Sequence, residues 1–185
     1  MKTIMVDMDD VLTYGNFSKI LEDYLGYRPD YDNIKNYYIQ DILGEKKDDF
    51  FSKFKDMDMY ANASLLPDCY EALKELSKYY KIYICTDYIW REIIEHAGNN
   101  LKNKYNFLYN KLDFIEPRNY IFTADKSIVN CDIKIDDKIS NIEGAETKLL
   151  FTAWHNKDLT KEELDNQNIV RVNNWIEIRK ILLED

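Results

Sequence analysis

The sequence predicts an α/β protein with a parallel sheet and a small helical subdomain inserted after the first strand. Short apolar runs, rich in β-branched and aromatic residues, end in polar residues, which is typical of strands buried on both faces. Helical patterns separate most of these runs. This alternation of strand and helix implies right-handed βαβ units, whose strands lie parallel in one sheet.

Five runs have the length and composition of strands. Because the C-terminal ends of parallel strands lie at one edge of a sheet, we expect the polar side chains that end these runs to meet there. The runs are residues 4–6, 82–85, 120–122, 133–135 and 149–151, and the residues that follow them are Asp7, Thr86, Thr123, Asp136 with Asp137, and Thr152.

The segments between and after these runs have helical patterns. Pro67 suits a first helical turn, and Leu73 and Leu76 then fall on one face of the helix that it opens. The end of the chain is amphipathic at helical spacing. The predicted helices are residues 67–80, 89–110, 138–145 and 175–183.

Residues 14–64 interrupt the alternation, since they have a helical pattern and no clear strand. A segment of this length is too long for a plain βα loop. We therefore expect a core of residues 1–13 and 65–185 and a helical cap subdomain of residues 14–64. The cap is expected over the carboxyl edge of the sheet, where ligands bind in open α/β folds.

Composition excludes several classes of protein. A formal net charge of −9 argues against a nucleic-acid polymer as partner, although a metal ion and a few lysines can hold a small phosphorylated ligand in an acidic protein. The three isolated cysteines argue against a disulfide scaffold or a zinc site and fit a reducing cytoplasm. With no apolar run near the roughly 18 residues of a membrane span, we expect a soluble cytoplasmic protein without a membrane partner.

The predicted sheet edge gathers four carboxylates, one hydroxyl and one ammonium. Carboxylates that lie this close repel each other unless a cation binds, and hard oxygen ligands with few histidines favour Mg²⁺. The expected metal ligands are Asp7, Asp9, Asp136 and Asp137, and the other two groups belong to Thr86 and Lys126, the latter just beyond the 120–122 strand.

This arrangement suits phosphoryl transfer through a covalent intermediate. Asp7 is the expected nucleophile, which attacks phosphorus and forms an acyl-phosphate. Asp9, two residues later, is expected to protonate the leaving oxygen and then to deprotonate the water that breaks the intermediate. Thr86 and Lys126 are expected to bind the phosphoryl group and neutralise its charge.

Four segments resemble, in the right order, the four motifs of the haloacid-dehalogenase (HAD) superfamily: residues 7–13, 84–86, 125–126 and 135–137. Residues 125–129, 135–137 and 150–156, with the late Trp175, are similar to the 5'(3')-deoxyribonucleotidases within it. The resemblance runs from residue 2 to about 183. It implies a Rossmannoid three-layer core with a helical cap, and Mg²⁺-dependent hydrolysis of nucleoside monophosphates, often deoxypyrimidine ones.

The resemblance also implies roles for further residues. In that family aromatic side chains of the cap stack on the base, and Tyr37 and Tyr38 stand where we expect them, with Phe17 a weaker candidate. Lys104 resembles a second lysine beside the phosphate. The family pattern favours Asp137 over its neighbour for direct contact with the metal.

The sequence departs from the family pattern at three positions. Asp87 takes a phosphate-side position after Thr86 that is often serine or another small residue. Asp10 replaces the usual glycine, and Ala124 stands where some relatives carry an arginine that helps to recognise the substrate.

His96 and His155 have no partner spacing for a triad or a metal site, and we interpret both as structural.

Two alternatives to a nucleotidase stay open. A phosphatase of the same chemistry could act on another small phosphate ester, selected by the altered cap. A phospho-accepting signalling domain also gathers aspartates, a threonine and a lysine around Mg²⁺, but Asp9 favours turnover over storage of the phosphoryl group. The sequence does not decide base or sugar preference, 5' versus 3' phosphate, or oligomeric state, and a homodimer stays open.

Overall fold

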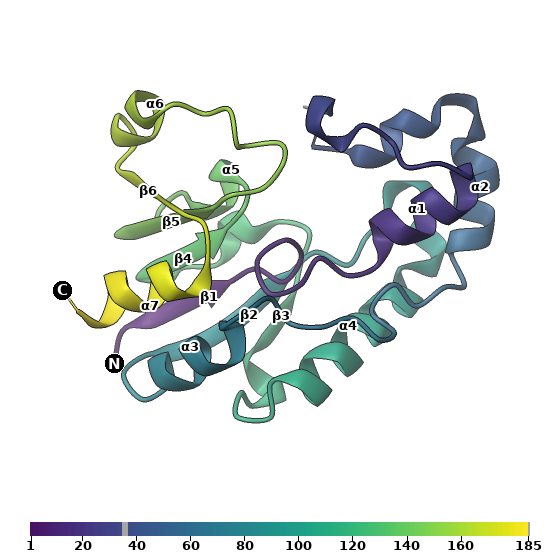
Figure 1. The fold of residues 1–185 in the computed structure, drawn as a ribbon. Helices are drawn as coiled ribbons and strands as arrows, with labels where there is room; N and C mark the ends of the chain where they lie inside the picture. Colours follow the sequence, from purple (N-terminus) through teal and green to yellow (C-terminus); the bar gives the residue numbers. More distant parts are fainter. Residues whose placement is uncertain (35–36, 185) are drawn as a thin grey trace.

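A computed structural model describes residues 1–34 and 37–184 of the chain (Figure 1). Its centre is a sheet in the order β3-β2-β1-β4-β5-β6, and every pair of neighbouring strands is parallel. The strands are β1 (Thr3–Val6), β2 (Lys81–Thr86), β3 (Tyr120–Phe122), β4 (Ile133–Asp136), β5 (Thr147–Phe151) and β6 (Ile169–Val172). The predicted parallel α/β sheet is therefore confirmed.

The sheet has its topological switch point between β1 and β4. From β1 the chain builds outward through β2 to β3 on one side, and from β4 through β5 to β6 on the other. Val6 lies opposite Ile135 in this central pair, and the Asp7 amide donates to the Ile135 carbonyl at 2.9 Å. Because ligands of open α/β sheets bind beyond the strand ends at a switch point, Asp7 and Asp136 stand where a ligand is expected.

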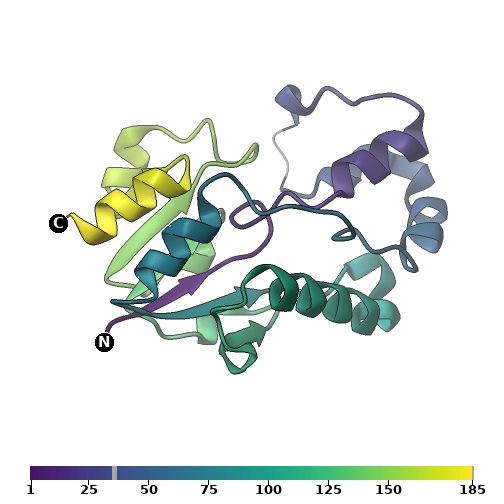
Figure 2. The same cartoon turned by 60° about the horizontal axis from the view of Figure 1, so that its bottom comes forward.

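Helices cover both faces of the sheet and complete a three-layer core (Figures 1 and 2). α3 (Cys69–Leu76), α4 (Ala97–Lys111) and α7 (Trp175–Leu183) pack buried side chains into the large core cluster. The short helices α5 (Ile139–Ile142) and α6 (Lys161–Asp165) contribute to a smaller cluster on β5 and β6. Among the described residues, no helix has the length and apolar character needed to cross a bilayer.

Several predicted bounds differ from the structure. The helix predicted from Pro67 begins at Cys69, because Asp68 adopts a left-handed conformation with φ of +62°. The helix predicted over residues 89–110 is divided into η3 (Arg91–His96) and α4. α6 and β6 were not predicted, since α6 is short and β6 is an edge strand of four residues whose Val170 is exposed.

The described part of residues 14–64 contains helices and loops that extend beyond the carboxyl end of the sheet (Figure 2). Its elements are α1 (Phe17–Leu25), η1 (Tyr31–Asn33), η2 (Ile39–Lys46) and α2 (Lys47–Phe54). Phe17 packs edge-on against Phe54 with ring centroids 5.3 Å apart, and it stacks on Trp90 at 4.8 Å. Trp90 precedes η3, so the aromatic cluster joins this segment to the chain that follows β2.

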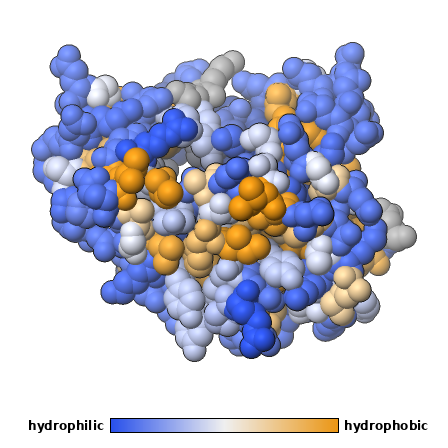
Figure 3. Space-filling model, turned by 180° about the vertical axis from the view of Figure 1, so that it is seen from behind, coloured by the Kyte–Doolittle hydropathy of each residue, from blue (hydrophilic) through white to orange (hydrophobic). Residues whose placement is uncertain are grey.

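The face seen from behind is mainly hydrophilic, in a chain with a net charge of −9 (Figure 3). Seen from behind, hydrophobic residues gather near the middle of the face, with hydrophilic residues around them (Figure 3).

Candidate active site

The ends of β1 and β4 bring three buried carboxylates together. Asp7, Asp136 and Asp137 each offer a carboxylate oxygen, and these oxygens lie within 4.8 Å of one another. The Asp7 carboxylate also accepts a hydrogen bond of 2.6 Å from the Met8 amide. Hard oxygen donors at this spacing suit Mg²⁺ better than a soft metal, so these three residues could hold the ion.

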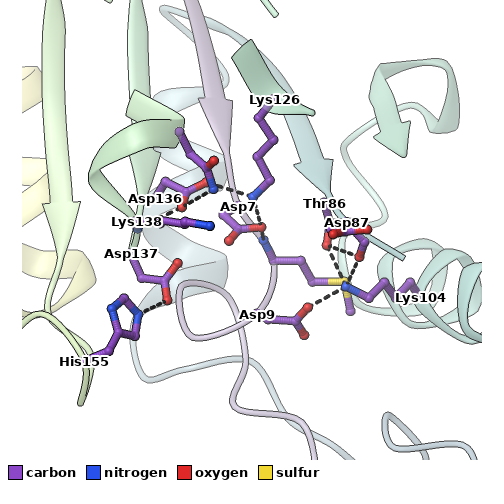
Figure 4. A network of polar contacts seen from close by, with 12 residues as sticks. Asp7, Asp9, Thr86, Asp87, Lys104, Lys126, Asp136, Asp137, Lys138 and His155 are labelled. Carbon is purple, nitrogen blue, oxygen red and sulfur yellow. Dashed lines mark hydrogen bonds and ion pairs between the residues drawn. The ribbon is translucent and has the colours of Figure 1, made fainter. Parts of the chain in front are cut away.

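Lys126 lies beside two of these carboxylates (Figure 4). Its Nζ is 2.6 Å from Oδ1 of Asp7 and 2.8 Å from Oδ2 of Asp136, and the lysine is buried. The lysine belongs to η5 (Lys126–Ile128), which Asp125 caps by accepting from the Ser127 amide. The structure therefore places the Lys126 ammonium next to Asp7, the expected nucleophile.

The electrostatics of the cluster follow from its burial. Burial raises the pKa of Asp7 to about 7, with the charge of Asp136 adding to the rise and Lys126 opposing it. Burial likewise raises the pKa of Asp136 against the attraction of Lys126. For Lys126 burial acts to lower the pKa, but the charges of Asp136 and Asp7 outweigh it and raise the value. One ammonium among three carboxylates leaves negative charge that a divalent cation could neutralise.

Asp9, predicted as a fourth metal ligand, lies outside this carboxylate cluster. Its Oδ2 is 2.5 Å from Nζ of Lys104, and its Oδ1 accepts a hydrogen bond of 2.6 Å from the Tyr60 hydroxyl. The structure therefore places the Asp9 carboxylate between a cation and a phenol. This position, next to the proposed nucleophile but away from the other carboxylates, is compatible with proton transfer.

Lys104 joins Asp9 to the end of β2. The lysine is buried on α4, and its Nζ donates to Oγ1 of Thr86 at 2.7 Å and to the backbone carbonyl of Asp87. The predicted phosphate-side residues thus form two groups, with Lys126 beside Asp7 and Lys104 beside Asp9 (Figure 4). The Lys126 and Lys104 ammonium groups, which lie on either side of Asp7, could bind the oxygens of one phosphoryl group.

His155, which the sequence indicated as structural, contacts the carboxylate cluster. Its Nε2 lies 2.7 Å from Oδ2 of Asp137, and its ring packs edge-on against Tyr37 with centroids 4.9 Å apart. The next residue, Asn156, donates to the Asp137 carbonyl at 2.7 Å. Both residues belong to the 150–156 segment that carries the family resemblance, and this resemblance was the one indication in the sequence that they lie at the site. Residue spacing did not indicate it, because Asp137 is distant from His155 in sequence.

A cavity of about 370 Å³ opens over these groups, and its wall contains all the predicted site residues except Asp136. The predicted base-stacking residues differ in exposure. Tyr37 is 39% exposed and lies under the Lys138 ammonium, while the Arg91 guanidinium covers the Tyr38 ring at 4.6 Å. Phe17 is only 6% exposed because it packs in the aromatic cluster with Trp90.

The three departures from the family pattern all line this cavity. Asp10 has φ of +59°, a conformation that glycine adopts without strain and that aspartate tolerates better than most residues. Burial and then the charge of Asp137 raise the pKa of Asp10 well above its usual range. The Asp87 carboxylate accepts from the Ile89 amide at 2.8 Å. Ala124 contributes only a methyl group to the wall.

Known proteins resemble this chain along its whole length. The sequence model of the family described as 5' nucleotidase, deoxy (pyrimidine), cytosolic type C protein matches residues 1–184. A 5'(3')-deoxyribonucleotidase of Bacillus subtilis (strain 168) is 31% identical over 189 aligned residues, covering 98% of this chain and 99% of that protein. A putative 5'(3')-deoxyribonucleotidase of Staphylococcus aureus (strain Mu50 / ATCC 700699) is 24% identical, covering 100% and 97%.

Solved structures resemble it in fold. A haloacid dehalogenase-like hydrolase from Streptococcus pneumoniae superposes with a TM-score of 0.54 at 18% identity over 96% of each chain. A putative HAD-hydrolase from Bacillus subtilis, solved with magnesium bound, superposes with a TM-score of 0.51 at 10% identity over 98% of each chain. Likeness at these identities establishes the fold.

Proposed function

This chain belongs to the 5' nucleotidase, deoxy (pyrimidine), cytosolic type C family of HAD-like proteins, and we propose that it hydrolyses deoxyribonucleoside monophosphates to nucleoside and phosphate. Family membership confirms the resemblance inferred from the four motifs and makes the chain a phosphoric monoester hydrolase. The proposal adds the substrate, a Mg²⁺ requirement and an aspartyl-phosphate intermediate.

One observation carries the mechanistic part of this proposal. Asp7 is a buried carboxylate on the wall of the cavity, 2.6 Å from the Lys126 ammonium and close to two other carboxylates. A carboxylate in this position has both a cation that favours its ionised form and an open side from which phosphorus can approach.

The reaction would proceed in two displacements. In the first, a carboxylate oxygen of Asp7 attacks phosphorus, the bond to the nucleoside oxygen breaks, and Asp9 gives its proton to that leaving oxygen. In the second, water attacks phosphorus and loses a proton to Asp9, while the bond to Asp7 breaks and releases phosphate. Mg²⁺, held by Asp7, Asp136 and Asp137, would supply positive charge to the phosphoryl oxygens.

The remaining donors would position the phosphoryl group. Lys126 contacts Asp7, Lys104 contacts the Thr86 hydroxyl, and all three donor residues line the cavity (Figure 4). The Asp87 backbone carbonyl accepts from Lys104 and so helps to hold that lysine at the phosphate. Such preorganised charges act strongly in a partly dehydrated site.

The cap would supply the base-binding wall. We propose that residues 14–64 act as the cap of a core formed by residues 1–13 and 65–185, and that Tyr37 and Tyr38 stack on the base. The position of Tyr38 on the cavity wall under Arg91 supports this role. Phe17, deep in the aromatic cluster, would support the wall more than touch the base.

A second candidate function has one observation in its favour. Asp10 and Asp87 add carboxylates to the cavity wall, which could redirect the site to a phosphate ester whose alcohol part carries hydrogen-bond donors. This would be the same chemistry on another small substrate.

We further propose that the protein acts in the cytoplasm, which its isolated cysteines support.

A substrate panel tests the proposal. The protein is incubated with Mg²⁺ and with deoxyribonucleoside and ribonucleoside 5'- and 3'-monophosphates, alongside sugar phosphates, and released phosphate is measured. We expect turnover of deoxyribonucleoside monophosphates that stops when a chelator is added. Hydrolysis of sugar phosphates with nucleotides untouched would refute the nucleotidase. Transfer of one phosphoryl group to each protein molecule, without further turnover, would support a signalling domain.

A further inference from the structure

Both carboxylate oxygens of Asp9 are engaged by donors from distant parts of the chain. The Tyr60 hydroxyl donates to Oδ1 at 2.6 Å, and Nζ of Lys104 lies 2.5 Å from Oδ2. Tyr60 follows α2, on the cap side, whereas Lys104 belongs to α4. Because the two donors bind opposite oxygens, they fix the rotation of the Asp9 carboxylate about its Cβ–Cγ bond.

Tyr60 is held firmly for such a contact. The residue is 4% exposed, and its ring packs on Phe107 with centroids 5.7 Å apart. Its backbone amide donates to Oδ1 of Asp58 at 2.9 Å, and its carbonyl accepts from the Ala63 amide at 3.0 Å. The phenol ring is therefore fixed in place. Its hydroxyl can keep the hydrogen bond to Asp9 in one orientation of the carboxylate only.

The two donors differ in what they can do during a proton transfer. An ammonium only donates, so Lys104 can contact only an Asp9 oxygen that carries no proton. A phenol hydroxyl both donates and accepts, so Tyr60 can keep its contact with Oδ1 of Asp9 whether or not that oxygen carries the proton. Lys104 also bonds Thr86 and the Asp87 carbonyl, whereas within the described chain the Tyr60 hydroxyl has the Asp9 contact alone.

We infer that Tyr60 is a positioning residue that keeps the Asp9 carboxyl group aimed at the leaving oxygen in both of its protonation states. This inference rests on the proposed function, in which Asp9 is the acid and base. When phosphate occupies the site and attracts Lys104, Tyr60 would be the partner that keeps Asp9 in place. Tyr60 itself need not touch the reacting atoms.

Leaving-group dependence tests this role. A nucleoside alkoxide needs a proton to leave, but the phenolate of p-nitrophenyl phosphate does not. The ratio kcat/KM reports the steps up to release of the leaving group, so it isolates the step in which Asp9 acts as an acid. We expect Tyr60→Phe to lower kcat/KM about 10-fold to 100-fold for the best nucleotide or other alkyl monophosphate, and less than about 2-fold for p-nitrophenyl phosphate.

Two further variants complete the experiment. Tyr24→Phe is the matched control, because it removes a similar hydrogen bond of 2.7 Å, to Asp49, on the exposed side of the cap. It should change neither substrate's kcat/KM. In an Asp9→Asn background, Tyr60→Phe should cause no additional loss on the alkyl ester, because a positioning residue has nothing left to position.

The outcomes separate this inference from the proposed function. Equal losses on both esters would mean that Tyr60 supports binding or folding, and no loss on either would mean that Asp9 is positioned without it; both results overturn the inference while the phosphatase assignment stands. Full additivity with Asp9→Asn would overturn it as well. A wild-type protein that releases phosphate from no ester would refute the phosphatase mechanism itself.

Discussion

The Lys126 ammonium lies 2.6 Å from Oδ1 of Asp7, and both side chains are buried at the carboxyl end of the sheet. The same ammonium is 2.8 Å from Asp136, so it is shared between the proposed nucleophile and a proposed metal ligand. A buried carboxylate with a shared cation is only partly neutralised. We therefore expect metal binding and pH to change the stability and activity of the site together.

Asp7→Asn should abolish phosphate release. The amide keeps the size of the side chain but cannot form an acyl-phosphate, so we expect a fall of about 1,000-fold or more under Mg²⁺. Phosphate release and circular dichroism of the same sample would separate lost chemistry from lost folding. Asp49→Asn, an exposed change on α2, is the matched control. Residual turnover near the wild-type rate in Asp7→Asn would rule out Asp7 as nucleophile.

Mg²⁺ should stabilise the folded protein through the carboxylate cluster. A ligand that binds only the folded state raises the melting temperature as its concentration rises. We expect a Mg²⁺-dependent rise in the wild-type protein, reversed by a chelator together with activity. Asp137→Asn should shift this dependence to higher Mg²⁺ concentration, because it removes the negative charge of one of the three carboxylates. If Asp137→Asn responded like the wild type, Asp137 would not be a ligand.

The metal-free protein should lose stability as pH rises through the acidic range. Burial raises the folded-state pKa of Asp7 from 3.8 to about 7, and that of Asp136 in the same direction. A carboxyl whose pKa is higher in the folded state favours folding below its unfolded pKa, and this contribution disappears as pH rises toward the folded pKa. The melting temperature in chelator should therefore fall between about pH 4.5 and about pH 7.5.

Two comparisons check the origin of this pH dependence. Asp7→Asn removes one of the titrating groups, so its melting temperature should fall less over the same pH range. Mg²⁺ should reduce the fall in the wild type, since the ion offsets the charge that burial disfavours. A melting temperature that rises steadily with pH in chelator would contradict the assigned shifts.

Trp175→Phe should destabilise the protein and loosen the loop that follows Asp7 and Asp9, the proposed catalytic residues. Trp175 is fully buried, and its Nε1 donates to the Val11 carbonyl at 2.9 Å. The change leaves a small cavity and an unsatisfied carbonyl, at a cost of about 2 kcal/mol. Urea unfolding measures it, with Ile176→Ala on the exposed side of α7 as a control expected within about 0.5 kcal/mol of wild type.

Two cap substitutions should have different effects. Tyr38→Ala should raise KM for nucleotides about 10-fold, because base stacking on an aromatic side chain is worth roughly 1–3 kcal/mol, and should leave p-nitrophenyl phosphate less affected. Phe17→Ala should mainly lower the melting temperature, since Phe17 is buried against Trp90 and Phe54. Steady-state kinetics and thermal melts on both variants check this division. A KM effect from Phe17→Ala at unchanged stability would contradict it.

The sequence alone was sufficient for five of the six strands of the parallel sheet and for the group at its carboxyl edge. A strand in a buried parallel sheet must be apolar over its length, so the runs that end at Asp7, Thr86 and Asp136 could be recognised locally. Since parallel strands end at one edge, their proximity followed without coordinates. Lys126 followed from its motif, and the four motifs in order identified the family.

Only the tertiary structure decided which side chains face each other within that group. It paired His155 with Asp137 and Tyr60 with Asp9, contacts between residues far apart in sequence. It also turned the Asp9 carboxylate toward Lys104, and it placed Trp90 against Phe17 in the segment of residues 14–64. Periodicity determines which face of an element is buried, but the direction of a side chain and its partner depend on how separate elements pack, and local sequence does not encode that packing.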